Sequence, residues 1–328
     1  VFAQVQAGAD AFAAANATDP AVNPLLALQP VQFLPPFLAF PNSVEDGQSN
    51  DENTTYTFRL AYDATDNINV YGSVATGFKA TSWNLSRDSR PVAGDLAAIQ
   101  AAGLATPNLT TGTRFAGPEE ATVYELGIKG AFDRVAFNAA IFDQTIEGFQ
   151  SNVFTGTGFE LLNAGEQSTQ GVELDVTWNP VDPLTLVFAG TFLDPVYDSF
   201  PDSASGDLSG QTPAGIPEVS TSISATYDFL LNNGWDAFLR SDWQYASETP
   251  YFDDAANQAL IGFEQEINTF NASAGFTTDG GLSVTAWARN IFDDEYITTA
   301  FPSVAQAGSL SGYPSQPATY GVTVRQRF

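Results

Sequence analysis

An alternation of apolar and polar side chains runs through most of this chain and continues to its C-terminus. The final segment, ATYGVTVRQRF, places Tyr320, Val322, Val324 and Phe328 on one side and small, hydroxyl and arginine residues on the other. Successive side chains of an extended strand point to opposite faces, so this segment has one apolar and one polar face. A membrane β-barrel needs such a closing strand, with the apolar face toward lipid and the polar face toward the lumen. Gln326 interrupts the apolar side.

The same period of two recurs upstream and predicts about eleven strands. Turn sequences rich in Asp, Asn, Gly and Pro separate several of them, such as LLNNG and TTDGG. The expected strands cover residues 55–62, 68–78, 122–130, 135–142, 171–178, 184–192, 218–229, 235–245, 268–276, 282–290 and 318–328.

The connections between these segments alternate between short and long. The long ones cover approximately residues 79–120, 147–167, 195–216, 248–264 and 293–317. Sandwiches and propellers do not sort their loops in this way, whereas barrels with short periplasmic turns and long outer loops do. The predicted fold class is therefore all-β, a transmembrane antiparallel β-barrel.

Composition excludes several functions. The net charge of −27 disfavours a nucleic-acid partner, which needs clustered Lys and Arg. The chain has no Cys and no His, so disulfides, thiolate nucleophiles, a Ser-His-Asp triad and haem ligation by His are excluded. We expect no enzyme activity and no cofactor. The most apolar run, residues 24–40, contains too many prolines to cross a membrane as a helix.

The first fifty residues do not alternate. Residues 7–17 are rich in Ala, which suits a short helix, and a Pro-rich stretch follows. Residues 1–50 are interpreted as the tail of an outer loop, and residues 51–328 as barrel. The start at Val1 and the absence of a signal peptide indicate a mature fragment.

Four segments resemble motifs of TonB-dependent outer-membrane receptors, in the order found in that family. They are YGSVATGFKATSWNL at 71–85, YELGIKG at 124–130, NAGEQSTQGVELD at 163–175 and NIFDDEYITTAF at 290–301. Thr81 replaces the proline that is usual in the first. The last contains Asn290, Phe292, Asp293 and Tyr296, which are expected to have structural roles. Asn290 and Asp293 suit backbone turns, and the two aromatic residues suit a girdle at the membrane interface.

The resemblance implies the C-terminal half of a 22-stranded barrel, whose plug domain would lie upstream of this chain. It also implies an outer-membrane protein of a Gram-negative bacterium that takes up a scarce nutrient, by default an iron–siderophore complex. The implied partners are outer-membrane lipid, the plug, the TonB complex and the nutrient. A passive porin-like channel or adhesin barrel without a plug, and a soluble all-β binding protein, remain alternatives.

The candidate ligand contacts are Trp83, Arg87, Arg90 and Arg114, all in the first long loop. Guanidinium groups suit anionic iron chelates, although salt bridges between loops would use the same residues. The loop carboxylates Asp202, Asp207, Asp253 and Asp254 could bind calcium, but ordinary solvated carboxylates explain them more simply. Tyr245, Tyr251 and Phe252 could stack on a ligand ring, with an interface girdle the simpler role for Tyr245.

Overall fold

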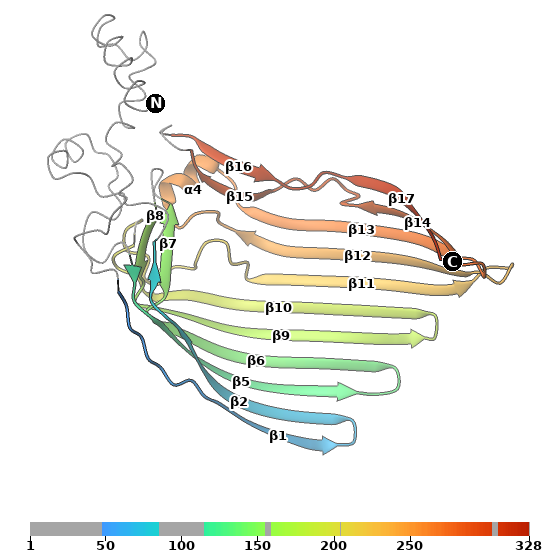
Figure 1. Ribbon diagram of the computed structural model, residues 1–328, viewed down its shortest axis with the longest axis horizontal. Coiled ribbons are helices and arrows are strands. Elements are labelled where there is room, and N and C mark those ends of the chain that lie inside the picture. The colour runs from blue at the N-terminus through green and yellow to red at the C-terminus, as the bar shows by residue number, and fades with distance from the viewer. Residues whose placement is uncertain (1–47, 85–114, 155–158, 204, 304–307, 328) are drawn as a thin grey trace, which may run out of the picture.

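Eleven antiparallel strands form one curved sheet (Figure 1). This computed structural model describes residues 48–84, 115–154, 159–203, 205–303 and 308–327. The number of strands agrees with the sequence prediction. In their order across the sheet they are β1 (Thr57–Thr65), β2 (Ile68–Lys79), β5 (Glu119–Ala131), β6 (Val135–Glu147), β9 (Glu166–Val181), β10 (Leu184–Ser199), β11 (Val219–Leu230), β12 (Asp236–Thr249), β13 (Gln265–Thr277), β14 (Leu282–Arg289) and β17 (Thr319–Gln326).

The connections are sorted between the two ends of the sheet, as predicted. Residues 66–67, 132–134, 182–183, 231–235 and 278–281 form the short turns, and these lie together at one end, here called the short-turn end (Figure 1). The other connections, residues 80–118, 148–165, 200–218, 250–264 and 290–318, start from the opposite end, here called the long-loop end.

The long connections contain small elements that alternation did not predict. The described residues of these connections contain three two-stranded ribbons: β3 (Ser82–Trp83) with β4 (Phe115–Ala116), β7 (Gln150–Phe154) with β8 (Phe159–Asn163), and β15 (Ile297–Pro302) with β16 (Leu310–Pro314). The helix α4 (Ala255–Ile261) begins after Asp254, whose side chain accepts a hydrogen bond from the backbone N–H of Asn257. It ends at Gly262, whose φ of 75° is the left-handed conformation that favours glycine.

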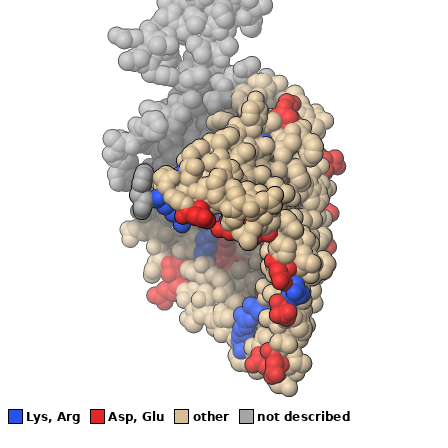
Figure 2. Space-filling view, turned by 90° about the vertical axis from the view of Figure 1, so that its right-hand side faces the viewer, with Lys and Arg blue, Asp and Glu red and all other residues tan. Residues whose placement is uncertain are grey.

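The two faces of the main sheet differ in chemistry. Cross-strand pairing places Leu60, Gly72, Leu126, Ile141 and Val172 in one row on the apolar face. The opposite, polar face holds every Lys and Arg of the main-sheet strands, and Figure 2 shows charged side chains in the hollow of the sheet. These cations are Arg59, Lys79, Lys129, Arg240, Arg289 and Arg325. This arrangement avoids a cost of about 2–4 kcal/mol for each Lys or Arg placed against mid-membrane lipid.

Aromatic rings cover glycines on the neighbouring strand. Tyr71 lies opposite Gly127, and a Cβ built on Gly127 would be 2.3 Å from the Tyr71 ring. Phe142 lies opposite Gly171 in the same way, at 2.4 Å. Glycine is required at both positions because the ring occupies the space of its missing side chain. These pairs fix the register locally.

The terminal strand β17 pairs with β14 and exposes Tyr320, Val322 and Val324 on the apolar face. Gln326 occupies the next position on that face, and its side-chain amide donates to the backbone oxygens of Gly280 and Arg327, at 2.8 and 2.7 Å. This residue therefore joins the strand end to the β13–β14 turn. Phe328 lies outside the described residues.

Among the described residues, none of the helices has the length and apolar character needed to cross a membrane. Residues 1–47 lie outside the described part of the chain, and with them nearly all of the expected outer-loop tail.

Candidate functional site

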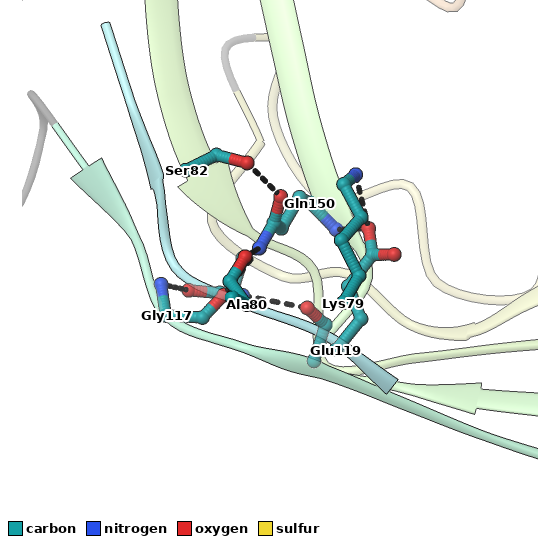
Figure 3. Close-up of polar contacts among 8 residues, drawn as sticks. Lys79, Ala80, Ser82, Gly117, Glu119 and Gln150 are labelled. Atoms are coloured by element: carbon teal, nitrogen blue, oxygen red, sulfur yellow. Dashed lines mark hydrogen bonds and ion pairs between the residues drawn. The ribbon is translucent and has the colours of Figure 1, made fainter. Parts of the chain in front are cut away.

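A hydrogen-bonded cluster at the long-loop end joins the first two long connections, residues 80–118 and 148–165, and Gln150 is its centre (Figure 3). The side-chain nitrogen of Gln150 donates to the backbone oxygens of Ala80 and Gly117, at 2.9 and 2.7 Å. Its side-chain oxygen accepts a hydrogen bond from the hydroxyl of Ser82. Gln150 is only 8% exposed, so these bonds satisfy a buried amide that would otherwise be costly.

An ion pair extends the cluster to the polar face of the sheet. Lys79 and Glu119 are cross-strand partners at the ends of β2 and β5, with their charged atoms 3.1 Å apart. The same carboxylate oxygen accepts the backbone N–H of Gln150 at 2.6 Å. The side chain of Glu119 is 13% exposed and that of Lys79 is 55% exposed. Water therefore screens Lys79, and the hydrogen bond to Gln150 gives Glu119 its structural importance.

Asn163, at the end of β8, likewise uses its side-chain amide to bind backbone groups of the two connections. Its amide accepts the backbone N–H of Gly117 at 2.7 Å and donates to the backbone oxygens of Gly117 and Gly148, at 3.0 and 2.6 Å. Gln150 and Asn163 together replace missing backbone partners for the loop segments between the strands. We call these two amides and Glu119 the rim clasp.

Of the four predicted ligand contacts, only Trp83 lies in the described residues. It pairs with Phe115 in the β3–β4 ribbon, with ring centroids 5.1 Å apart, and its indole N–H donates to the hydroxyl of Ser49 at 3.2 Å. Arg87, Arg90 and Arg114 lie outside the described residues. In the chain, β3 precedes and β4 follows the segment that carries these three arginines. Their contact with a ligand therefore stays a prediction.

A small hydrophobic core holds the next long loops together. Tyr197, Phe200, Leu208 and Ala164 are its buried members, and Phe149 and Leu162 pack against it. The rings of Tyr197 and Phe200 meet edge-on with centroids 5.3 Å apart. These residues come from two connections, 148–165 and 200–218, and from the end of β10, so the loops form a packed structure at this end.

Three of the four proposed calcium ligands accept hydrogen bonds from the protein itself. Asp253 accepts the backbone N–H of Ala214 at 2.8 Å, and Asp254 is the N-cap of α4. Asp207 accepts hydrogen bonds from Ser209, which lower the pKa of its carboxyl. Within the described parts of the chain, no group of three or more acidic side chains is arranged to hold a metal ion.

The aromatic candidates also have protein partners. Tyr245 stacks on Trp243, with ring centroids 5.8 Å apart. Tyr251 packs edge-on against Phe263, and its hydroxyl accepts the backbone N–H of Ile297 at 3.2 Å. Burial raises the pKa of Tyr251, and this hydrogen bond lowers it by less.

The NIFDDEY segment forms a sharp corner after β14. Asn290 and Asp293 have positive φ values of 47° and 55°, which are uncommon outside glycine. Asn290 is buried; its side chain donates to the backbone oxygens of Asp294 and Gln316 and accepts the backbone N–H of Asp294. Asp293 accepts the backbone N–H of Ala318 at 2.7 Å, which brings the chain back to β17.

The two aromatic residues of this segment differ in environment. The Phe292 side chain is 75% exposed and its ring lies 5.6 Å from that of Phe270. Tyr296 exchanges hydrogen bonds with Ser315 through its backbone. An interface girdle therefore remains a prediction for both residues.

Sequence reasoning missed the rim clasp. Gln150 has no local signal, because a single Gln in a long loop is ordinary and its partners are 31 to 70 residues away. Asn163 begins the family-like NAGEQ segment, which could have indicated it. The caps of α4, Asp254 and Gly262, were readable as helix boundaries.

One apolar face, one charged face and connections sorted by length define the class of transmembrane antiparallel β-barrels. A family model described as "TonB dependent receptor-like, beta-barrel" matches residues 35–291. The chain belongs to this family, and the predicted family and fold class are thereby confirmed. The family consists of receptors and transporters, not enzymes, and its barrels reside in the Gram-negative outer membrane.

Individual proteins to which the chain is similar are outer-membrane receptors and transporters of this kind. The chain is 26% identical over 261 residues to the vitamin B12 transporter BtuB of Photobacterium profundum, covering 77% of this chain and 36% of that protein. Its fold is similar to that of the ferric yersiniabactin uptake receptor FyuA from Yersinia pestis, with a TM-score of 0.66 and 20% identity. That match covers 86% of this chain and 38% of FyuA. The fold is also similar to BauA, the ferric preacinetobactin receptor from Acinetobacter baumannii, with a TM-score of 0.58 and 20% identity. That match covers 86% of this chain and 37% of BauA. The chain thus spans just over a third of the length of each.

Proposed function

We propose that this chain is the C-terminal half of a 22-stranded barrel in an outer-membrane receptor that imports a scarce nutrient with energy from the TonB complex. The family match to residues 35–291 is the observation that carries the proposal. A plug domain upstream would occupy the lumen, and the polar face of the sheet would surround it. The cations Arg59 and Lys129, which lie 3.9 and 5.5 Å from the Tyr71 ring centroid, belong to that wall.

The proposed nutrient is an iron–siderophore complex. The neighbours FyuA and BauA are receptors for ferric siderophores, which supports this choice, whereas the relative BtuB transports vitamin B12. The first long loop of this chain offers an indole at Trp83 and guanidinium groups at Arg87, Arg90 and Arg114. Such a set suits an anionic chelate with aromatic groups. The rim clasp would hold the base of this loop in place.

Uptake measurements test the proposal. A strain with the full-length receptor as its only outer-membrane receptor would be given iron-55 complexes of several siderophores and, separately, labelled vitamin B12. We expect accumulation of at least one ferric complex, abolished by deletion of TonB. Uptake that persists without TonB, or a large steady conductance of the receptor in a planar bilayer, would contradict active transport and indicate a passive channel.

The residues can be tested in the same strain. Replacing Trp83 by Ala should raise the half-saturating ferric-complex concentration about fivefold to tenfold with little change in maximal rate, since one ring contact is lost. Trp235 is a suitable control, because it stacks on Phe276 at the short-turn end. Equal effects of the two substitutions would argue against a ligand contact at Trp83.

A further inference from the structure

One part of the polar face carries no carboxylate. Strands β13, β14 and β17, which the structure describes throughout, contain a single acid, Glu266, and its position in β13 places it on the apolar face. This is unusual in a chain with 38 acidic and 11 basic residues. We call the polar face of these three strands the arginine strip, and its main side chains are Ser273, Trp287, Arg289, Thr323 and Arg325.

The wall formed by β5 and β9 has the opposite character. Its polar face carries one cation, Lys129, and four carboxylates, those of Glu119, Glu125, Glu173 and Asp175. Like charges repel, so an anion in the lumen is disfavoured beside that wall and favoured beside the arginine strip.

Trp287 and Arg289 form one prearranged surface on the strip. Trp287 lies opposite Gly321, and a Cβ built on Gly321 would be 2.6 Å from the Trp287 ring, so the ring rests on the neighbouring strand. Its indole N–H donates to the hydroxyl of Thr323 at 3.2 Å. The guanidinium carbon of Arg289 lies 5.3 Å from the centroid of the same ring. The indole is thereby fixed in place, with a cation directly beside it.

The positive charge of the strip is not neutralised by the protein. No ion pair among the described residues involves Arg289 or Arg325. Arg240, on the neighbouring strand β12, differs, because it donates three hydrogen bonds to Asp242, at 3.1, 3.0 and 2.6 Å. Carboxylates and phenolates are the partners that a free guanidinium binds most strongly. An anion is therefore the occupant that this surface lacks.

The strip lies inside the barrel, below the long loops. Arg289 is seven residues beyond Leu282, the first residue of β14 at the short-turn end. Seven residues of strand span about 23 Å, which is about 18 Å of height for a strand tilted by about 40°. The apolar band of such barrels is about 25 Å tall, so Arg289 lies within the membrane-spanning wall. Arg325 lies opposite Ser283, nearer the short-turn end.

We infer that the arginine strip is a second nutrient site, inside the lumen, which binds an anionic chelate with aromatic groups during its passage through the barrel. Arg289 binds a phenolate or carboxylate oxygen of the chelate, and Trp287 offers its ring to an aromatic group. The carboxylates of β5 and β9 direct the anion toward this side of the lumen. The inference rests on the proposed function and adds to it the route of the nutrient and its charge.

Uptake and surface binding, measured separately, test the strip. The probe is the iron-55 complex of a triscatecholate siderophore, which is strongly anionic and aromatic. Cells with the full-length receptor as their only outer-membrane receptor give the maximal uptake rate per receptor molecule in the outer membrane. The same cells without TonB give the Kd for binding at the cell surface.

Two substitutions at Arg289 separate its charge from its packing. Arg289→Gln should lower the maximal uptake rate about tenfold, the loss expected for a hydrogen bond to a charged group, and leave the surface Kd unchanged. Arg289→Lys keeps the charge and should recover most of the rate. The control is Arg240→Gln with Asp242→Asn, which removes a neutral pair from the same wall and should leave the rate unchanged.

Several outcomes would overturn the inference. An equal loss of uptake in the control contradicts a special role of the strip, and a raised surface Kd in Arg289→Gln places Arg289 in the outer site instead. Entry of vancomycin into Arg289→Gln cells would show that the strip holds the plug and not the nutrient. A receptor that imports only uncharged complexes or vitamin B12 refutes the strip and the proposed nutrient together. Normal uptake of the triscatecholate complex by Arg289→Gln refutes the strip alone.

Discussion

Replacing Gln150 by Leu should open the long-loop end while leaving the barrel wall intact. The side chain forms three hydrogen bonds, with the backbone oxygens of Ala80 and Gly117 and the hydroxyl of Ser82. Each contributes about 1 kcal/mol, and a buried carbonyl left without a partner costs about 1–3 kcal/mol. The substitution thus removes roughly 3 kcal/mol or more from the local stability of these segments. Local opening should become more than about 100-fold more frequent.

Amide hydrogen exchange of the full-length receptor, followed by mass spectrometry, measures this opening. Exchange should accelerate in peptides covering residues 80–84 and 115–118, and remain slow in the paired centres of β5 and β6. Gln244→Leu is the matched control, because Gln244 lies exposed on β12 far along the sheet. Unchanged exchange at the long-loop end in the Gln150→Leu receptor would refute the clasp, as would equal acceleration in both variants.

Three further predictions concern the sheet and one loop. Gly171→Val should lower the temperature at which the barrel unfolds, as followed on heated gels, because the new Cβ would lie 2.4 Å from the ring of Phe142. Gly77→Ala is the control and should be tolerated, because the nearest atom to its new Cβ is 3.4 Å away. Leu126→Lys on the apolar face should cost about 2–4 kcal/mol in a reversible folding titration, and Val123→Lys on the polar face of the same strand much less. Equal costs would contradict the assignment of the faces. Burial raises the pKa of Tyr251 above its usual value of 10.0, so Tyr251 stabilises its loop below pH 10, and this contribution is lost as the pH rises further. The ultraviolet absorbance of ionised tyrosine, compared between the native receptor and Tyr251→Phe, should show Tyr251 ionising after the exposed tyrosines.

The strands and their order could be predicted from sequence because their causes are local. Each strand alternates since one face meets lipid and the other the lumen, and short turns carry their own Asp, Asn and Gly signals. The register is a different matter. It depends on pairs such as Tyr71 over Gly127, which come from strands joined by a long loop. Four family-like segments then located the sheet within a known architecture.

The candidate site was predicted less well. The chemistry of their side chains predicts ligand contacts at Trp83, Arg87, Arg90 and Arg114, and the structure describes the surroundings of Trp83 alone. The sequence also allows Asp253 and Asp254 as calcium ligands. In the structure, Asp253 accepts a backbone N–H and Asp254 caps a helix. An acidic side chain has the same appearance in the sequence whether it binds a cation, water or the backbone.

The sequence by itself determined the class of fold, the number of strands and which side chains face lipid, because a period of two acts residue by residue. The tertiary structure alone decided how the long loops close at the rim. Gln150 and Asn163 gain their roles from backbone groups far away in the chain, which a sequence pattern does not specify. It also placed Gly72, Leu126, Ile141 and Val172 side by side, because that alignment depends on the register of four separate strands.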